Sequence, residues 1–343
     1  MPNSPGPISS FPPRKFPIKR LIAVGVTLLL LGILFYKVDR QALLRNLSQT
    51  DPVYFLLALL MFVPQLLVQA WRWQRMVGVF APISLRESVS LILASNTMNL
   101  ALPAKMGDLT KGYFLTRTGT LDLKRAMNIV IFEKMLDVAC LALVMITGVA
   151  MLFSRGEATG VLARQAIFAA ALGAVAVAGV AILYFVPTRY IPGWNALLTA
   201  LAARPKLAKI HSLLQASHET ISLLQSRGAN RPLICAYSIA IWMFHMIQIY
   251  LFFLCLTPAM NQPAPLAQFI SLVPLAIFIG LIPLTVAGFG ARDMAIIRFF
   301  PLQGEAAMLG VSLYINLRYI LPAIAGMPFL NRYLTMAKPA DQQ

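Results

Sequence analysis

Long apolar runs without charge, separated by short polar segments, dominate this sequence of 343 residues. A helix of about 20 apolar residues crosses the hydrocarbon core of a bilayer, which is about 30 Å thick. About six runs are predicted as transmembrane helices, at residues 21–36, 52–70, 126–153, 166–186, 232–256 and 305–331. The pattern therefore predicts an all-α polytopic integral membrane protein.

Two further apolar runs are shorter, and each leads into a segment interrupted by proline and glycine. Residues 88–101 lead into Pro103, and residues 266–281 lead into Pro283. Because proline and glycine interrupt helices, each run is predicted to form a re-entrant helical hairpin instead of a full span. Flanking basic residues indicate that the first hairpin opens to the cytoplasm and the second to the outside. Opposite orientations are typical of an inverted repeat, whose binding site lies near the bilayer midplane.

The remaining segments are tails, a polar insert and helix ends within a single transmembrane domain at residues 18–335. Residues 1–17, rich in proline and serine, are predicted as a disordered tail, and residues 336–343 as a C-terminal tail. The insert at about 187–231 is predicted to form amphipathic helices on the cytoplasmic side. Basic residues before the first span, which is expected to be uncleaved, and after the last place both termini in the cytoplasm. The segment Trp71–Arg75 is interpreted as an interfacial anchor of aromatic and basic residues.

Composition excludes a soluble domain and favours a membrane protein. Hydrophobic residues make up 59% of the chain and charged residues 12%, against about 25% charged in soluble domains. The net charge of +17 reflects basic cytoplasmic loops, so no nucleic-acid partner is expected. No metal or other cofactor is predicted, because Cys140, Cys235 and Cys255 lie in apolar runs and the histidines lack ligand spacing. His245, alone in an apolar span, is interpreted as a packing residue.

Charged residues inside or beside apolar segments are the candidates for function. Each costs roughly 2.5–3.5 kcal/mol at the bilayer centre, so each needs a partner or a purpose. Nine are predicted to bind a lipid headgroup: Lys105, Asp108, Lys111, Arg117, Glu133, Asp137, Arg292, Asp293 and Arg318. The cations would bind a phosphate, while Glu133 and Asp137, on one helix face, would suit an amine. Alternatively the charges form structural pairs, Asp137 with Arg318 and Arg292 with Asp293.

Three stretches resemble the lysylphosphatidylglycerol synthase transmembrane family, also called flippase-like, which includes the membrane half of the multiple peptide resistance factor. They are Asn99–Lys111, Phe132–Asp137 and Pro283–Asp293. Where the family usually has Gly-Glu, Glu-Arg and Arg-Glu, this chain keeps the charge signs with Asp or Lys. The resemblance covers roughly residues 20–335 and implies a bacterial inner-membrane protein that moves a lipid between leaflets. The soluble aminoacyl-transfer domain of multidomain members is expected to be absent, so the chain itself is not expected to be the synthase.

Three functional hypotheses follow from these residues. The first is a translocator for an anionic or aminoacylated phospholipid. The second is a membrane-embedded enzyme, or enzyme subunit, that acts on a polyprenyl-phosphate or glycolipid, and the third is a non-transporting scaffold for a lipid synthase. Catalytic and nucleotide-binding motifs are missing from the sequence, which makes an enzyme less favoured than a translocator. The expected partners are a membrane phospholipid or polyprenyl-linked lipid, a lipid synthase or glycosyltransferase, and a second copy of the chain.

Overall fold

The structure is a computed structural model of the whole chain. It describes residues 25–30, 32, 36, 39–102, 106–185, 199–200, 230–282, 285 and 287–335. The elements within these ranges are all helices, which confirms the all-α prediction for the described residues. They are α2 (Arg40–Ser48), α3 (Pro52–Leu60), α4 (Phe62–Gly78), α5 (Leu85–Ala101), η1 (Met106–Leu109), α6 (Thr110–Arg117), α7 (Leu123–Ser154), α8 (Gly160–Phe185), α11 (Arg231–Cys255), η5 (Thr257–Ala259), α12 (Leu266–Leu281), α13 (Ala291–Phe299), η6 (Pro301–Gln303) and α14 (Glu305–Thr335).

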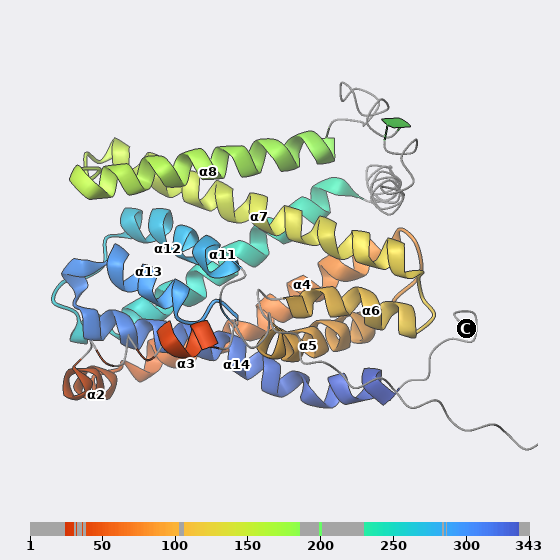
Figure 1. Cartoon of the computed structure of the whole chain (residues 1–343), viewed down its shortest axis with the longest axis horizontal. Coiled ribbons are helices and arrows are strands. Elements are labelled where there is room, and N and C mark those ends of the chain that lie inside the picture. Colours follow the sequence, from red (N-terminus) through yellow and green to blue (C-terminus); the bar gives the residue numbers. More distant parts are fainter. Residues whose placement is uncertain are drawn as a thin grey trace, which may run out of the picture.

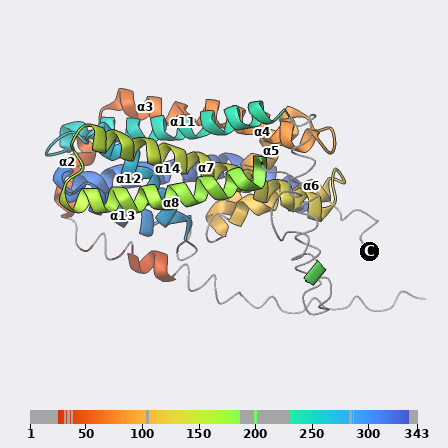
Figure 2. The ribbon, with the colours of Figure 1, turned by 90° about the horizontal axis from the view of Figure 1, so that it is seen from above.

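Within the described residues, five helical segments are long and apolar enough to cross a membrane. They are Pro52–Gly78, Leu123–Ser154, Gly160–Ile182, Arg231–Cys255 and Glu305–Thr335. These segments correspond to five of the predicted spans. Figure 2 shows α11 with α3 and α4 along one side of the bundle and α8 along the other, with α7 between them.

Several sequence-based predictions concern parts of the chain outside the described residues. Half of the predicted first span, residues 21–36, lies outside them. So do the two tails, 1–17 and 336–343, and nearly all of the predicted amphipathic insert at 187–231. These features stay predictions.

Two pairs of short helices occupy opposite ends of the bundle, as Figure 1 shows. In the first pair, α5 packs against the segment formed by η1 and α6. In the second pair, α12 packs against α13. The long helix α14 runs beneath both pairs and contacts α5 and α13. The pairs agree in position with the two predicted hairpins, while their re-entrant placement in a membrane remains a prediction.

The first pair is held together by close backbone packing at Gly107. A Cβ atom at this position would lie 2.2 Å from the backbone nitrogen of Asn99, too close for any side chain. Asn99 and Asp108 also bond to each other: the Asp108 N–H donates to Asn99 Oδ1 at 3.1 Å, and Asn99 Nδ2 donates to Asp108 Oδ1 at 3.0 Å. These contacts fix the carboxylate of η1 against the C-terminal end of α5.

The second pair is fixed by a glycine turn and a buried ion pair. Gly288 has a φ of 80°, and a Cβ atom there would lie 2.7 Å from the carbonyl oxygen of Gly280. Asp293 caps α13 by accepting from the Gly290 N–H at 3.0 Å, and it pairs with Arg292 at 3.1 Å. Asn316 of α14 accepts from Arg292 and donates to Asp293 at 3.3 Å. The turn before α13 is thereby tied to α14.

Candidate functional site

A cavity of about 350 Å³ lies inside the bundle, where the ends of the two helix pairs approach each other. Asn99 and Asp108 line it from the first pair, and Leu281 and Ala287 line it from the second. Helices α4, α7, α11 and α14 complete its wall. The volume is at the lower end of the range for small-molecule sites, about 300–1,000 Å³. The cavity therefore suits a polar group of modest size and is too small for a long acyl chain as well.

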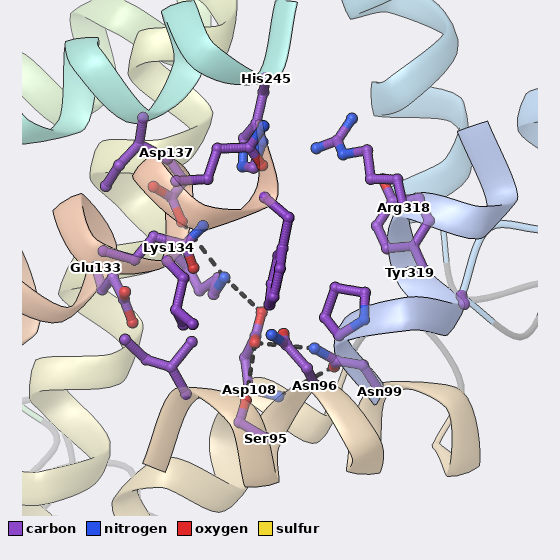
Figure 3. A pocket seen from close by; sticks show the side chains of 18 of the residues that line it. Ser95, Asn96, Asn99, Asp108, Glu133, Lys134, Asp137, His245, Arg318 and Tyr319 are labelled. Carbon is purple, nitrogen blue, oxygen red and sulfur yellow. Dashed lines mark hydrogen bonds and ion pairs between the residues drawn. The ribbon is translucent and has the colours of Figure 1, made fainter. Parts of the chain in front are cut away.

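Charged side chains of both signs line this cavity. The basic ones are Arg72, Lys111, Lys134 and Arg318, and the acidic ones are Asp108, Glu133 and Asp137. Five of the nine predicted residues are therefore gathered in one place. Figure 3 shows Glu133, Lys134 and Asp137 on one wall and Arg318 with Tyr319 on the opposite wall.

Arg72 is the centre of the ion-pair network. Its Nη2 lies 2.8 Å from Glu133 Oε1, and its Nη1 lies 2.6 Å from Asp137 Oδ1. The same Nη1 donates to Ser238 Oγ at 3.0 Å. Glu133 and Asp137 lie one helical turn apart on α7, so the two arms of one planar guanidinium group reach both carboxylates.

Two lysines extend the network to the first helix pair. Lys111 of α6 pairs with Glu133, and its Nζ lies 4.7 Å from the centre of the Trp73 ring. Lys134 Nζ lies 2.5 Å from Asp108 Oδ2 and 3.3 Å from Asp137 Oδ2. The other oxygen of Asp108, Oδ1, accepts from Asn99 and from Ser95. Each carboxylate oxygen of the three cavity acids therefore already accepts from a protein group.

Arg318 is different, because its guanidinium forms no ion pair within the part of the chain that the structure describes. Its Nη1 is buried and has no hydrogen-bond partner. The group lies 5.1 Å from the centre of the Tyr319 ring and points into the cavity (Figure 3). The predicted pair of Arg318 with Asp137 is wrong, because Asp137 lies on the other wall and pairs with Arg72 and Lys134.

The other predicted residues do not line the cavity or are not described. Arg292 and Asp293 form the predicted structural pair; both side chains are buried and neither lines the cavity. Arg117 lies at the C-terminal end of α6, with its guanidinium 5.7 Å from the Tyr113 ring. Lys105 lies outside the described residues.

Arg72 was not among the predicted site residues, because Trp71–Arg75 has the composition of an interfacial anchor. The structure contradicts that interpretation for two of the five residues: Arg72 is 1% exposed and Trp73 is fully buried. A signal in the sequence could have revealed this. Gln65, Gln69 and Arg72 are spaced by four and three positions, so they share one helix face, and all three line the cavity.

Neutral polar side chains complete the lining. They are Gln65, Gln69, Ser95, Asn96, Asn99, His245, Gln248 and Tyr319. His245 faces the cavity and also packs edge-on against Trp242, with ring centres 5.3 Å apart. The described residues hold no group of three or more His, Cys, Asp or Glu side chains placed to bind a metal ion. The arrangement suits the binding of a polar anion, because among the described residues its acids are matched by cations and Arg318 is not matched by an acid.

Comparison with known families agrees with this geometry. Residues 20–326 match the family described as lysylphosphatidylglycerol synthase TM region, and the chain belongs to this family. The matched range contains both helix pairs and every residue of the cavity lining. The chain matches none of the curated proteins. Membership supports a membrane function related to lipids.

Proposed function

We propose that this member of the lysylphosphatidylglycerol synthase transmembrane family is a translocator that moves a phospholipid or related lipid between the leaflets of a bacterial inner membrane. The observation that carries the proposal is the charged cavity between helices long enough to span a bilayer. Intramembrane charges and interrupted helices that converge at one point are typical of transport sites. Both termini would lie in the cytoplasm, as the distribution of basic residues indicates.

The proposal includes a lateral opening through which a lipid enters the cavity. Met106 of η1 and Leu321 of α14 both line the cavity, and they are 48% and 40% exposed. Because both residues contact the cavity and the surface, we place the lateral opening beside them. A headgroup could occupy the polar cavity while its acyl chains pass this opening and stay in the hydrocarbon. Such an arrangement would lower the cost of moving a charged headgroup through the membrane.

A transport assay in liposomes tests the proposal. Purified protein is reconstituted with a headgroup-intact, fluorescently labelled phospholipid, and an impermeant quencher reports how fast the inner-leaflet label becomes accessible. Leu321→Trp should slow exchange, because the larger side chain narrows the lateral opening. Val175→Trp is the matched control, since Val175 is 74% exposed on α8 and does not line the cavity.

The outcomes separate the competing functions. Exchange no faster than in protein-free liposomes, across phospholipids and polyprenyl phosphates, would reject translocation. Chemical conversion of an added lipid, detected by mass spectrometry, would favour the membrane-embedded enzyme. Neither exchange nor conversion, together with stable capture of a lipid synthase, would favour the scaffold.

A further inference from the structure

We infer that the cavity selects a lipid headgroup that bears a phosphate and no amino group, and that Arg318 binds that phosphate. The inference rests on the proposed function and adds the class of lipid to it. Two separate observations support it: each carboxylate oxygen of the cavity already accepts from a protein donor, and Nη1 of Arg318 has no hydrogen-bond partner among the described residues.

The negative charge of the carboxylates is already matched by protein cations, which weakens their attraction for an ammonium group. Glu133 is bonded through one oxygen to Arg72 and through the other to Lys111. Asp137 is shared in the same way by Arg72 and Lys134. An amine beside either acid would have to compete with the protein cations that already neutralise it, and breaking such a buried pair is strongly unfavourable. This geometry argues against the expectation that Glu133 and Asp137 recognise an aminated headgroup.

Arg318, in contrast, is a cation that lacks an anionic partner among the described residues. Its Nη1 is buried without a hydrogen-bond partner, and no described carboxylate pairs with the group. A buried charge without a partner is costly, so an anion that enters the cavity gains from it. The guanidinium group presents parallel N–H donors that match two phosphate oxygens, so a phosphate is the anion that suits it best.

The surroundings of Arg318 restrict its orientation before any ligand binds. Its guanidinium lies 5.1 Å from the centre of the Tyr319 ring, and the guanidinium of Arg292 lies 5.0 Å from the same ring centre. Arg292 is immobilised by Asp293 and by Asn316. Contact with a ring that also contacts this fixed arginine limits the positions open to Arg318. Preorganisation of this kind favours binding, because less conformational entropy is lost.

The inferred ligand of this chain differs from the lipid in the name of its family. That name refers to the synthesis of a lysine-bearing phospholipid, whose amino groups would require free acceptors. With every cavity carboxylate occupied, we expect this chain to prefer the lipid without the added amino acid. Lipids that satisfy the requirement include phosphatidylglycerol and polyprenyl phosphates.

Binding to the purified protein tests the inference independently of transport. Short-chain phosphatidylglycerol, phosphatidylethanolamine and lysyl-phosphatidylglycerol are titrated in detergent, and the melting temperature (Tm) is followed. Phosphatidylglycerol should raise the Tm at concentrations at least about tenfold lower than either amino lipid, as the loss of charge complementarity implies. Soluble glycerol 3-phosphate should have a smaller effect than the lipid; an equal effect would overturn the assignment to a lipid.

Variants at Arg318 separate binding from a purely structural role. Without lipid, Arg318→Gln should melt at the same temperature as wild type or higher, because an unmatched buried charge is removed. Its affinity for phosphatidylglycerol should fall at least about tenfold, and Arg318→Lys should restore part of it. Arg298→Gln, which alters an exposed arginine of α13, is the matched control.

Two results would overturn the inference. One is equal or tighter binding of lysyl-phosphatidylglycerol by the wild type, a measurement that needs no variant to fold. The other is unchanged phosphatidylglycerol affinity in Arg318→Gln. Either result, combined with measurable lipid exchange in liposomes, would leave translocation standing. Conversely, selective binding that depends on Arg318, without exchange of any lipid, would reject translocation and retain the headgroup assignment.

Discussion

Replacing Arg72 by glutamine and Asp137 by asparagine, singly and together, tests the ion-pair network that forms one wall of the cavity. Arg72 is 1% exposed and bonds to Glu133, Asp137 and Ser238. In Arg72→Gln, both acids lose one charged donor, although Lys111 still pairs with Glu133 and Lys134 with Asp137. In Asp137→Asn, Arg72 keeps Glu133 and Lys134 keeps Asp108.

The structure sets the size of each effect. Removal of one partner from a buried pair costs about 3–5 kcal/mol, and the remaining lysines place Arg72→Gln near the lower value, about 3 kcal/mol. Asp137→Asn removes a charge but keeps a polar group, so about 1–3 kcal/mol is expected. The double variant should be more stable than the sum of the single losses predicts, with a coupling energy of about 1–3 kcal/mol.

The assay is reversible unfolding in mixed detergent micelles, applied to wild type, both single variants and the double variant. A second cycle with Arg318→Gln and Asp137→Asn serves as the control, because these residues lie on opposite walls of the cavity (Figure 3). The control cycle should be additive within about 0.5 kcal/mol. Additivity in the Arg72 cycle, or coupling of 1 kcal/mol or more in the Arg318 cycle, would refute the pairing derived from the structure.

Two further predictions concern the second helix pair and the topology. Arg292→Gln should destabilise the protein by about 3–5 kcal/mol, because it leaves Asp293 as a buried charge without a cation. Adding Asp293→Asn should recover part of the loss. An unchanged unfolding free energy in Arg292→Gln would show that the pair is not structural. Single cysteines at residues 3 and 341 of a cysteine-free protein should react with an impermeant maleimide only after the membrane is opened, and rapid labelling from the periplasmic side would contradict cytoplasmic termini.

Five of the predicted spans agree with helices of the structure, because the hydrocarbon of a bilayer imposes a minimum length and apolarity on a helix that crosses it. The run predicted at 126–153 appears as Leu123–Ser154, and the run at 232–256 appears as Arg231–Cys255. A long apolar helix satisfies its own backbone hydrogen bonds in hydrocarbon, so length and apolarity are strong evidence for a span. The ends of α5 and α12 were also predictable, because proline and glycine interrupt the backbone of a helix.

The partners of the charged residues could not be predicted in the same way. Arg72 and Arg318 are both basic residues in apolar helices, and the sequence does not reveal which one lies beside Asp137. That choice depends on how α4, α7 and α14 pack, which involves residues far apart in the chain. The pair of Arg292 and Asp293 was predictable because its members are adjacent. Arg72 was missed because its tryptophan neighbours favour an interface, whereas its glutamine neighbours one turn away indicate the interior.

The distribution of charge over the two walls determines how a bound anion would change the stability of the bundle. Arg72, Lys111 and Lys134 neutralise three acids, so the wall built by α4, η1, α6 and α7 is complete without a ligand. Arg318 stands apart on α14, the helix whose Asn316 also holds the second helix pair. An anion bound by Arg318 would therefore add a link between α14 and the rest of the cavity. Ligand binding should then stabilise the whole bundle, and this stabilisation should disappear in Arg318→Gln even where that variant alone is no less stable than wild type.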